Sequence, residues 1–90
     1  MKVTFDPYKR ATTLADRGLD FADAAQVFAG PIFTDQDVRF DYPEPRMQSY
    51  GFVDGRMVVM IWTPTDDGVR VISMRHCHDK EQRRYRSRLG

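Results

Sequence analysis

The order of apolar and polar residues predicts a chain that begins with a strand and a helix. The first five residues, MKVTF, alternate apolar and polar side chains, which is typical of a short strand. Asp6 and Pro7 follow as an N-cap and a first-turn proline. They predict a helix that runs to about Arg17 and ends at Gly18.

The next stretch, DFADAAQVFAGP, predicts a second helix that ends at Gly30-Pro31. Two aspartates lie in its first turn, where negative charge is favourable. Apolar residues at i, i+3, i+4 and i+7 would form its buried stripe: Phe21, Ala24, Ala25 and Phe28.

Strands dominate the second half of the chain. We expect a short strand near residues 32–33, then a surface loop that carries four carboxylates: Asp35, Asp37, Asp41 and Glu44. The segments RMQSYGFV and RMVVMIWT are joined by Asp54-Gly55, a strong hairpin signal. A turn at residues 66–68 leads to VRVISMR, and RMVVMIWT is apolar enough to be the central strand. The last segment, from about Asp79 to Leu89, is predicted to be helical.

This order predicts an α+β fold. Two N-terminal helices would pack on a three- to four-stranded antiparallel sheet, and a short C-terminal helix would follow. Ninety residues predict a single domain, 1–90, with one thin core. The expected core residues are Phe21, Phe28, Met47, Met57, Val58, Val59, Met60, Ile61, Trp62, Ile72 and Met74.

Composition narrows the class of protein. The single cysteine, Cys77, excludes an internal disulfide framework, so nothing indicates secretion. No apolar run approaches the roughly 18 residues of a membrane span, and the first residues do not resemble a signal peptide. We therefore expect a cytoplasmic protein.

The net charge of +1 hides an asymmetry between the two parts of the chain. Residues 1–69 contain seven Lys and Arg against eleven Asp and Glu, whereas residues 70–90 contain seven against two. The C-terminal part therefore carries a charge of +5, which would attract phosphates or an acidic partner.

Three interpretations apply to the charged stretch VISMRHCHDKEQRRYRSR, residues 71–88. His76, Cys77 and His78 are all metal-ligand types, but their spacing does not fit a zinc site and the chain has no other Cys or His. We therefore expect neither a metal nor a cofactor.

A solvated helix is the second interpretation. Asp79 and Gln82 resemble a capping box, and Glu81 is placed to pair with Arg84. Apart from Tyr85 and Leu89 such a helix has little to bury, so it would dock weakly or be completed by a partner.

Phosphate recognition and RNA cleavage form the third interpretation. Clustered guanidiniums bind phosphate oxygens and stabilise the charge that develops during cleavage. His76 and His78 titrate near neutral pH and suit acid–base work, and Glu81 is the competing base. Neighbouring arginines would lower the pKa of Glu81, which suits it better to orienting another group. The residues alone do not decide between this interpretation and a solvated helix.

Motifs along nearly the whole chain resemble those of the BrnT family of bacterial ribonuclease toxins. The N-terminal segment FDPYKRATTLADRGLDFADAAQVF is similar to the family's aromatic-Asp-Pro start and its two helices. DYPEPRMQSYGFVDGRMVVMIWTP resembles the family's loop, arginine and two strands. RVISMR and EQRRY resemble its last strand and its Glu-x-x-x-Tyr helix.

The resemblance implies a RelE-like fold and RNA cleavage without a metal. It also implies an inhibitory partner, a BrnA-like ribbon-helix-helix antitoxin, and contact with operator DNA only through that antitoxin. It assigns importance to Arg75, Glu81 and Tyr85. Arg17 stands where many members have His, and neither His76 nor His78 has a common counterpart, so the general base stays open.

The remaining basic residues are candidate RNA contacts. Arg46 and Arg70 would contact RNA if they share a sheet face with Arg75, although a solvated charge is an equal alternative. Tyr85 would stack a base, hydrogen-bond a phosphate or anchor the last helix. The helix N-terminus favours anions and adds three candidates: Lys80, Arg83 and Arg84.

Two questions stay open at this point. The acidic loop is most simply a solvated face, with folding onto the basic end or contact with an antitoxin as alternatives. The whole protein is also open to a non-catalytic interpretation, in which a decayed toxin binds an antitoxin or RNA through its basic end and cuts nothing.

Overall fold

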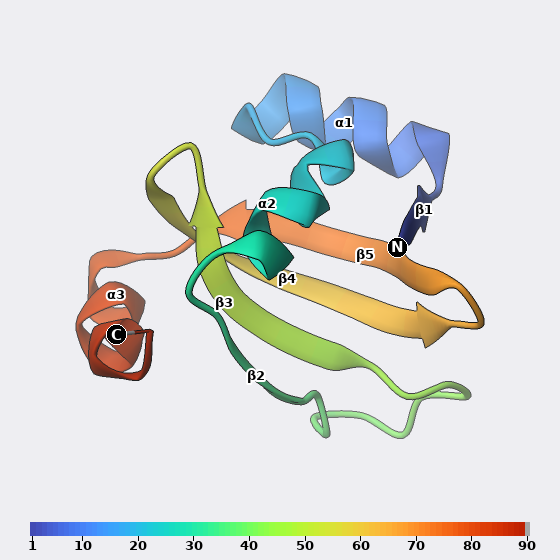
Figure 1. Cartoon of the computed structure of the whole chain (residues 1–90). Helices are drawn as coiled ribbons and strands as arrows, with labels where there is room; N and C mark the ends of the chain where they lie inside the picture. Colours follow the sequence, from blue (N-terminus) through green and yellow to red (C-terminus); the bar gives the residue numbers. More distant parts are fainter. Residues whose placement is uncertain (90) are drawn as a thin grey trace.

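The computed structural model describes residues 1–89 and shows a five-stranded sheet with the two N-terminal helices on one face (Figure 1). The strand order across the sheet is β1-β5-β4-β3-β2. The elements in chain order are β1 (Lys2–Phe5), α1 (Pro7–Arg17), the 3₁₀ turn η1 (Phe21–Asp23), α2 (Ala24–Ala29), β2 (Phe33–Gln36), β3 (Met47–Val53), β4 (Arg56–Thr65), β5 (Gly68–His76), α3 (Asp79–Tyr85) and the 3₁₀ turn η2 (Arg86–Arg88).

The α+β class is confirmed, but the expectation of a purely antiparallel sheet of three or four strands is wrong. β1 pairs in parallel with β5, in a register that places Lys2 opposite Gly68 and Phe5 opposite Val71. The other three pairings are antiparallel. MKVTF indicated a strand but not its partner, because the partner lies more than 60 residues further along the chain.

The first helix begins and ends as predicted. The Asp6 carboxylate accepts a hydrogen bond from the backbone N–H of Tyr8, and Gly18 is the C-cap of α1. The second helix differs in detail, because its first turn is the 3₁₀ turn η1. That tighter turn shifts the helical phase, so Val27 is buried where Ala25 was expected, and Ala25 is exposed.

Helix α2 approaches β3 closely at a glycine. A Cβ atom built on Gly51 would lie 2.9 Å from Cγ1 of Val27, closer than such atoms pack. The absence of a side chain at this position therefore lets the helix contact the sheet.

β4 is the central strand, as its apolar sequence predicted. It pairs with β3 through the predicted hairpin, whose turn residues Asp54 and Gly55 both have positive φ angles. It pairs with β5 on the other side, with a register shift between Ile61 and Trp62. Because side chains alternate along a strand, the register defines which residues share each face.

The face under α1 and α2, here called the covered face, contains the main core. Phe28 and Trp62 close one side of it in an edge-to-face contact, with ring centroids 5.2 Å apart. Both were predicted as core residues and pack against the core while partly buried; Ile61 and Met47 are also partly buried. The buried residues of this core are Leu19, Phe21, Ala24, Val27, Val53, Val58, Met60, Val71 and Met74.

The opposite face, here called the open face, has a smaller cluster at one end, where α3 and η2 dock. The Tyr85 ring stacks on Tyr50 with centroids 3.9 Å apart, and Leu89 is buried. The last helix is therefore more firmly attached than its sparse apolar content predicted. The cluster contains Tyr50, Met57, Val59, Cys77 and Leu89, with Phe33, Phe52 and Tyr85 packed against it.

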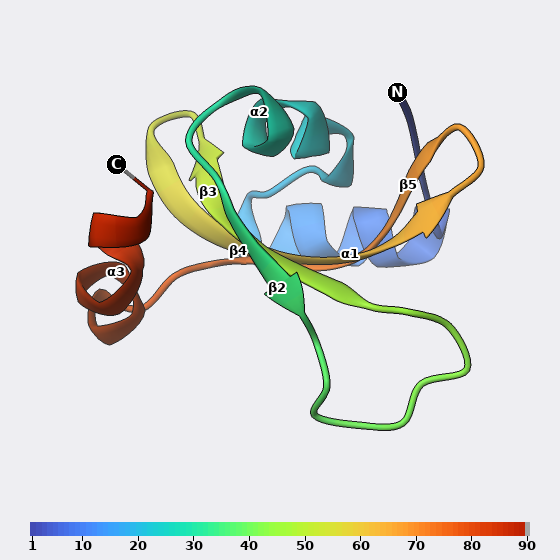
Figure 2. The same ribbon diagram turned by 60° about the horizontal axis from the view of Figure 1, so that its bottom comes forward.

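The β2–β3 loop, residues 37–46, leaves the sheet on the side away from α2 and projects from it (Figure 2). Its two ends are joined by a backbone hydrogen bond of 2.8 Å, from the N–H of Asp37 to the carbonyl of Arg46. Among residues 1–89, no helix is long and apolar enough to cross a membrane.

Candidate functional site

A pocket of about 250 Å³ on the open face gathers three guanidiniums that are distant in sequence. Arg17 comes from the end of α1, Arg39 from the β2–β3 loop and Arg75 from β5. We call it the arginine pocket. Its remaining lining residues are Gln48, Val59, Ile61 and Ser73.

The sheet register explains why these side chains meet. Arg75 lies opposite Val59, and Ser73 lies opposite Ile61, which in turn lies opposite Gln48. Residues directly opposite in an antiparallel ladder point to the same face. Three neighbouring strands therefore form the floor of the pocket.

Arg75 is held by Glu81 of α3 through two parallel hydrogen bonds. The Nη1–Oε1 distance is 2.7 Å and the Nη2–Oε2 distance is 2.8 Å. Nη1 also donates to the carbonyl of His76. This bidentate geometry fixes the plane of the guanidinium as well as its position.

The same contact removes Glu81 from acid–base work at neutral pH. Its hydrogen bonds with Arg75 lower the pKa of the Glu81 carboxyl to about 2, outweighing the effect of partial burial, and the N–H of His78 adds to the shift. A carboxylate with so low a pKa is a weak base. Glu81 is therefore suited to orienting Arg75, as its arginine neighbours predicted.

The His78–Glu81 contact is also the capping box of α3. The Glu81 carboxylate accepts a hydrogen bond of 2.9 Å from the N–H of His78, the N-cap residue. The expected box of Asp79 and Gln82 is therefore wrong by one position, because the helix begins one residue earlier than that pairing requires.

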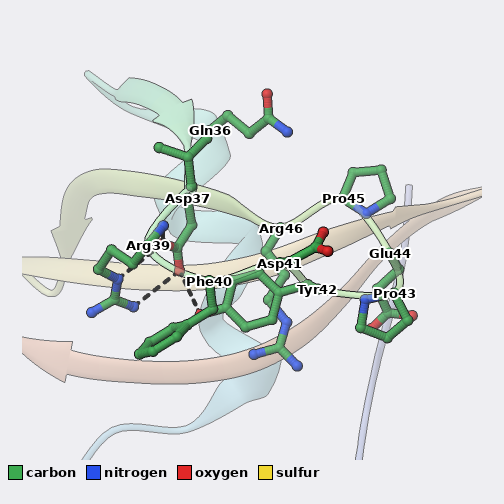
Figure 3. Close-up of a pocket in the computed structure, with 11 residues that line it drawn as sticks. Gln36, Asp37, Arg39, Phe40, Asp41, Tyr42, Pro43, Glu44, Pro45 and Arg46 are labelled. Carbon is green, nitrogen blue, oxygen red and sulfur yellow. Dashed lines mark hydrogen bonds and ion pairs between the residues drawn. The ribbon is translucent and has the colours of Figure 1, made fainter.

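Arg17 and Arg39 are held as well. Nη1 of Arg17 donates to the backbone carbonyl of Met74 at 2.9 Å. Arg39 forms two hydrogen bonds of 2.9 Å with the buried carboxylate of Asp37, which also accepts from Tyr42 (Figure 3). The Arg39 guanidinium holds the pKa of the Asp37 carboxyl below its usual range. The pocket is thus positively charged and its cations are fixed in place.

The sequence did not indicate Arg17 or Arg39 as phosphate contacts. Arg17 was considered only as a replacement for histidine, and Arg39 lies among carboxylates that suggested a solvated loop. The spacing Asp37-x-Arg39 was the available signal, since such a pair folds back on itself within one turn.

The two histidines occupy different surroundings. His76 lies opposite Val58, a residue of the covered-face core, and lines a separate hollow near the β3–β4 hairpin. Its Nδ1 atom is buried and has no hydrogen-bond partner among the described residues. His78 is exposed at the start of α3, and its charge is one of the influences that lower the pKa of Glu81. The structure therefore brings the imidazole of His78, and not that of His76, close to the Arg75–Glu81 pair.

The other predicted RNA contacts lie outside the arginine pocket. Lys80, Arg83 and Arg84 are exposed on α3, and Arg83 lines a hollow on that helix. Arg70 shares the open face with Arg75, but its guanidinium pairs with Glu44.

Arg46 does not reach the arginine pocket either. Its guanidinium lies 4.0 Å from the centre of the Tyr42 ring. The acidic loop therefore folds onto the basic end through Glu44 and Arg70, one of the alternatives that the sequence left open, and is not simply a solvated face.

Tyr85 anchors the last helix. Its ring stacks between those of Tyr50 and Phe33, with centroid distances of 3.9 and 5.9 Å. Of the three roles that the sequence allowed, these ring contacts fit the anchoring role.

Ligands for a metal are not clustered in the described part of the chain. No group of three or more His, Cys, Asp and Glu residues among residues 1–89 could hold a metal ion. Cys77 is buried, and burial raises the pKa of its thiol to about 11. It is therefore protonated at neutral pH and is a packing residue.

Comparison with known proteins identifies the family. A search of curated proteins gives no significant match. The family model described as "Ribonuclease toxin, BrnT, of type II toxin-antitoxin system" matches residues 5–81, which include the whole sheet after the first strand, Arg17, Arg39, Arg75 and Glu81. The match covers most of the chain, so this protein belongs to the BrnT family of ribonuclease toxins.

Proposed function

We propose that this protein is a metal-independent endoribonuclease that binds and cuts RNA at the arginine pocket. One observation carries the proposal: Arg17, Arg39 and Arg75 line a single pocket, and Arg75 is fixed by a bidentate contact with Glu81. Such an arrangement is complementary to a phosphate whose negative charge increases during the reaction.

The proposed reaction is an intramolecular transesterification, in which the phosphoryl group passes from the 5′ oxygen to the neighbouring 2′ oxygen. A base removes the proton from a ribose 2′-OH, the 2′ oxygen attacks the adjacent phosphorus, and the bond from phosphorus to the 5′ oxygen breaks. The 5′ oxygen then takes up a proton. The products are a 2′,3′-cyclic phosphate and a 5′-hydroxyl, and no water or metal is consumed. Arg75 would stabilise the dianionic transition state, while Arg17 and Arg39 would hold the non-bridging oxygens.

His78 is the residue that we assign to proton transfer. It is exposed, its imidazole can both take up and give a proton, and it lies at the N-cap of the helix that carries Glu81. Glu81 is a positioning residue in this assignment, because Arg75 keeps it ionised and weakly basic. His76 faces other surroundings and would not take part.

The lining of the pocket supports chemistry without a metal. Three guanidiniums against the carboxylates of Asp37 and Glu81 leave a net positive charge, which disfavours a divalent cation and supplies the charge that such an ion would bring to the phosphate. The site therefore supplies positive charge to the phosphate from its own side chains.

The biological setting follows from the family. As a type II toxin, this protein implies an antitoxin partner and an RNA substrate. We propose that the antitoxin is a BrnA-like ribbon-helix-helix protein, that the complex represses its own operon by binding DNA through the antitoxin, and that the toxin acts in the cytoplasm to stop translation and growth.

The direct experiment is cleavage of a defined RNA by purified protein in the presence of EDTA. Wild type should give products that end in a 2′,3′-cyclic phosphate. Arg75→Ala should lower kcat by about 10²- to 10³-fold, since removal of one fixed donor to the transition state has this effect in other enzymes. Expression of wild type alone should arrest bacterial growth, and Arg75→Ala should relieve the arrest.

Arg56→Ala is the matched control, because Arg56 is exposed at the β3–β4 hairpin and does not line the arginine pocket. It should cleave like wild type. Intact RNA after incubation with folded wild type, with or without divalent cations, would contradict the enzyme proposal.

A second candidate function has one observation in its favour. Among the described residues, no histidine, carboxyl or cysteine side chain lines the arginine pocket, which is what a toxin that binds RNA without cutting it would show. Such a protein would bind RNA with an affinity that falls as salt rises, and would give no products under any condition.

A further inference from the structure

The β2–β3 loop presents an exposed aromatic ring beside the arginine pocket. Phe40 is 68% exposed, and Val38 on the same loop is 76% exposed. Large exposed apolar side chains on a structured surface often mark a binding site. Phe40 directly follows Arg39, so the ring lies one residue away from a guanidinium of the pocket.

The loop that carries Phe40 is fastened at several points. The buried Asp37 carboxylate accepts from Arg39 and Tyr42, and the N–H of Asp37 bonds to the carbonyl of Arg46. These contacts close the loop on itself (Figure 3). A ring on such a loop is held in position before any ligand arrives, which lowers the entropy cost of binding.

Neighbouring rings support Phe40 from one side. Tyr42 meets it edge to face, with centroids 5.9 Å apart, and the Arg46 guanidinium lies over the Tyr42 ring. In Figure 3 the rings of Phe40 and Tyr42 lie side by side, with the Arg46 guanidinium next to Tyr42. The layered contacts leave much of the Phe40 ring free to contact a ligand.

The loop also bounds an open hollow of about 550 Å³, large enough for a nucleobase. Arg39 lines both this hollow and the arginine pocket, so the two are adjacent. Both arginines and carboxylates line the hollow, and two of its three carboxylates, Asp37 and Glu44, are paired with arginines. The positively charged arginine pocket next to the exposed Phe40 ring is the combination with which proteins hold single-stranded nucleic acid.

We propose that Phe40 is a stacking platform for the nucleobase that flanks the phosphate held in the arginine pocket. The inference rests on the proposed function, because it takes RNA as the ligand of that pocket. Arg39 would connect the two subsites by holding the phosphate backbone while Phe40 stacks the base. The loop would thereby influence which phosphodiester enters the pocket.

The test uses an RNA oligonucleotide that contains a cleavage site mapped with wild type and a 2′-deoxy residue that blocks attack there. Phe40→Ala should weaken its binding about tenfold, the usual effect of losing one base-stacking contact. Phe40→Trp should bind as tightly as wild type or more tightly, and Phe40→Leu should behave like Phe40→Ala.

An abasic nucleotide distinguishes stacking from a structural role of the ring. When the base next to the blocked phosphate is removed, one at a time on either side, one of the two abasic oligonucleotides should bind wild type and Phe40→Ala equally. A tenfold difference that persists on both abasic RNAs would overturn the proposal, because Phe40 would then act through the loop itself.

Tyr8→Ala is the matched control, since Tyr8 is an exposed aromatic residue on α1 and lines neither hollow. It should bind like wild type. If wild type cuts RNA and Phe40→Ala binds and cuts it equally well, the platform is wrong and the proposed function stands. If wild type cuts nothing, a generic single-stranded oligonucleotide with and without abasic positions replaces the mapped one. Phe40-dependent binding would then support the platform and contradict only cleavage, and absence of binding would contradict both.

Discussion

The two faces of the sheet are built from the same strands, but one face forms the main core and the other carries a charged pocket. On the covered face, β4 and β5 contribute buried residues such as Met60 and Met74. On the open face, β4 contributes Ile61 and β5 contributes Ser73 and Arg75 to a charged pocket. Because adjacent residues of a strand point to opposite faces, residues of the core and residues of the arginine pocket alternate along β5.

Because of this separation, substitutions at two adjacent residues of a strand should affect different properties of the protein. Changes on the covered face should lower the free energy of unfolding and leave the chemistry of the folded protein intact. Changes in the arginine pocket should impair the chemistry and leave the free energy of unfolding nearly unchanged. The end of the open face under α3 is intermediate, because the Tyr50–Tyr85 stack holds the helix that positions Glu81.

The largest expected effect separates the two histidines. His78→Gln should lower kcat by about 10²- to 10⁴-fold, since it removes the proposed acid–base group. His76→Gln should change kcat little, because His76 lines a different hollow. The measurement is RNA cleavage by both variants across pH, and a His76→Gln loss equal to that of His78→Gln would invalidate the assignment.

The next effect concerns two adjacent residues of β5. Met74→Ala should lower the free energy of unfolding by about 2–5 kcal/mol, because it leaves a cavity in the covered-face core. Cleavage per folded molecule should stay at the wild-type level. Urea unfolding together with cleavage assays at a temperature where the variant is folded would check this, and a folded but inactive Met74→Ala protein would speak against the separation.

Substitution of Tyr85 tests the end of the open face under α3. Tyr85→Ala removes the ring that stacks on Tyr50 and Phe33, and should cost about 2 kcal/mol of stability because the ring is only half-buried. It should also lower cleavage by loosening the helix that carries Glu81. Tyr85→Phe keeps the stack and should behave like wild type, whereas equal damage from both variants would indicate a direct role for the hydroxyl.

The smallest expected effect is the dependence of the free energy of unfolding on pH in the acid range. The pKa of Glu81 is lowered to about 2 in the folded protein, from an ordinary value near 4.5. Its contribution is therefore fully present above about pH 4.5 and is lost as the pH falls toward 2. Solvent screens this partly exposed pair, so we expect roughly 1 kcal/mol. The stability difference between wild type and Glu81→Gln should shrink across this range, and a constant difference would show that the charge does not matter.

Much of the fold follows from local signals in the sequence. The caps of α1, the hairpin at Asp54-Gly55 and the central position of β4 were all predicted, because each depends on a few neighbouring residues. The parallel pairing of β1 was not predicted, since no local pattern names a partner 60 residues away. The buried stripe of the second helix was misplaced because a 3₁₀ turn changed its phase.

The candidate site was predicted in part. The Arg75–Glu81 relation could be anticipated, because both residues lie in one short charged stretch. Arg17 and Arg39 could not, since only the folded chain brings the end of α1 and the β2–β3 loop to β5. Strand alternation also separates His76 from Arg75, although the two are adjacent in sequence.

The most direct test of the central claim is a map of RNA contacts on the folded protein. Backbone amide resonances would be followed during titration with an RNA whose attacking 2′-hydroxyl is replaced by hydrogen. The account predicts that the largest shifts occur on the open face, at Gln48, Ser73 and Arg75, and that Ala22 and Gln26 on the helical side do not move. Shifts concentrated on the helical side, with an unperturbed arginine pocket, would contradict it.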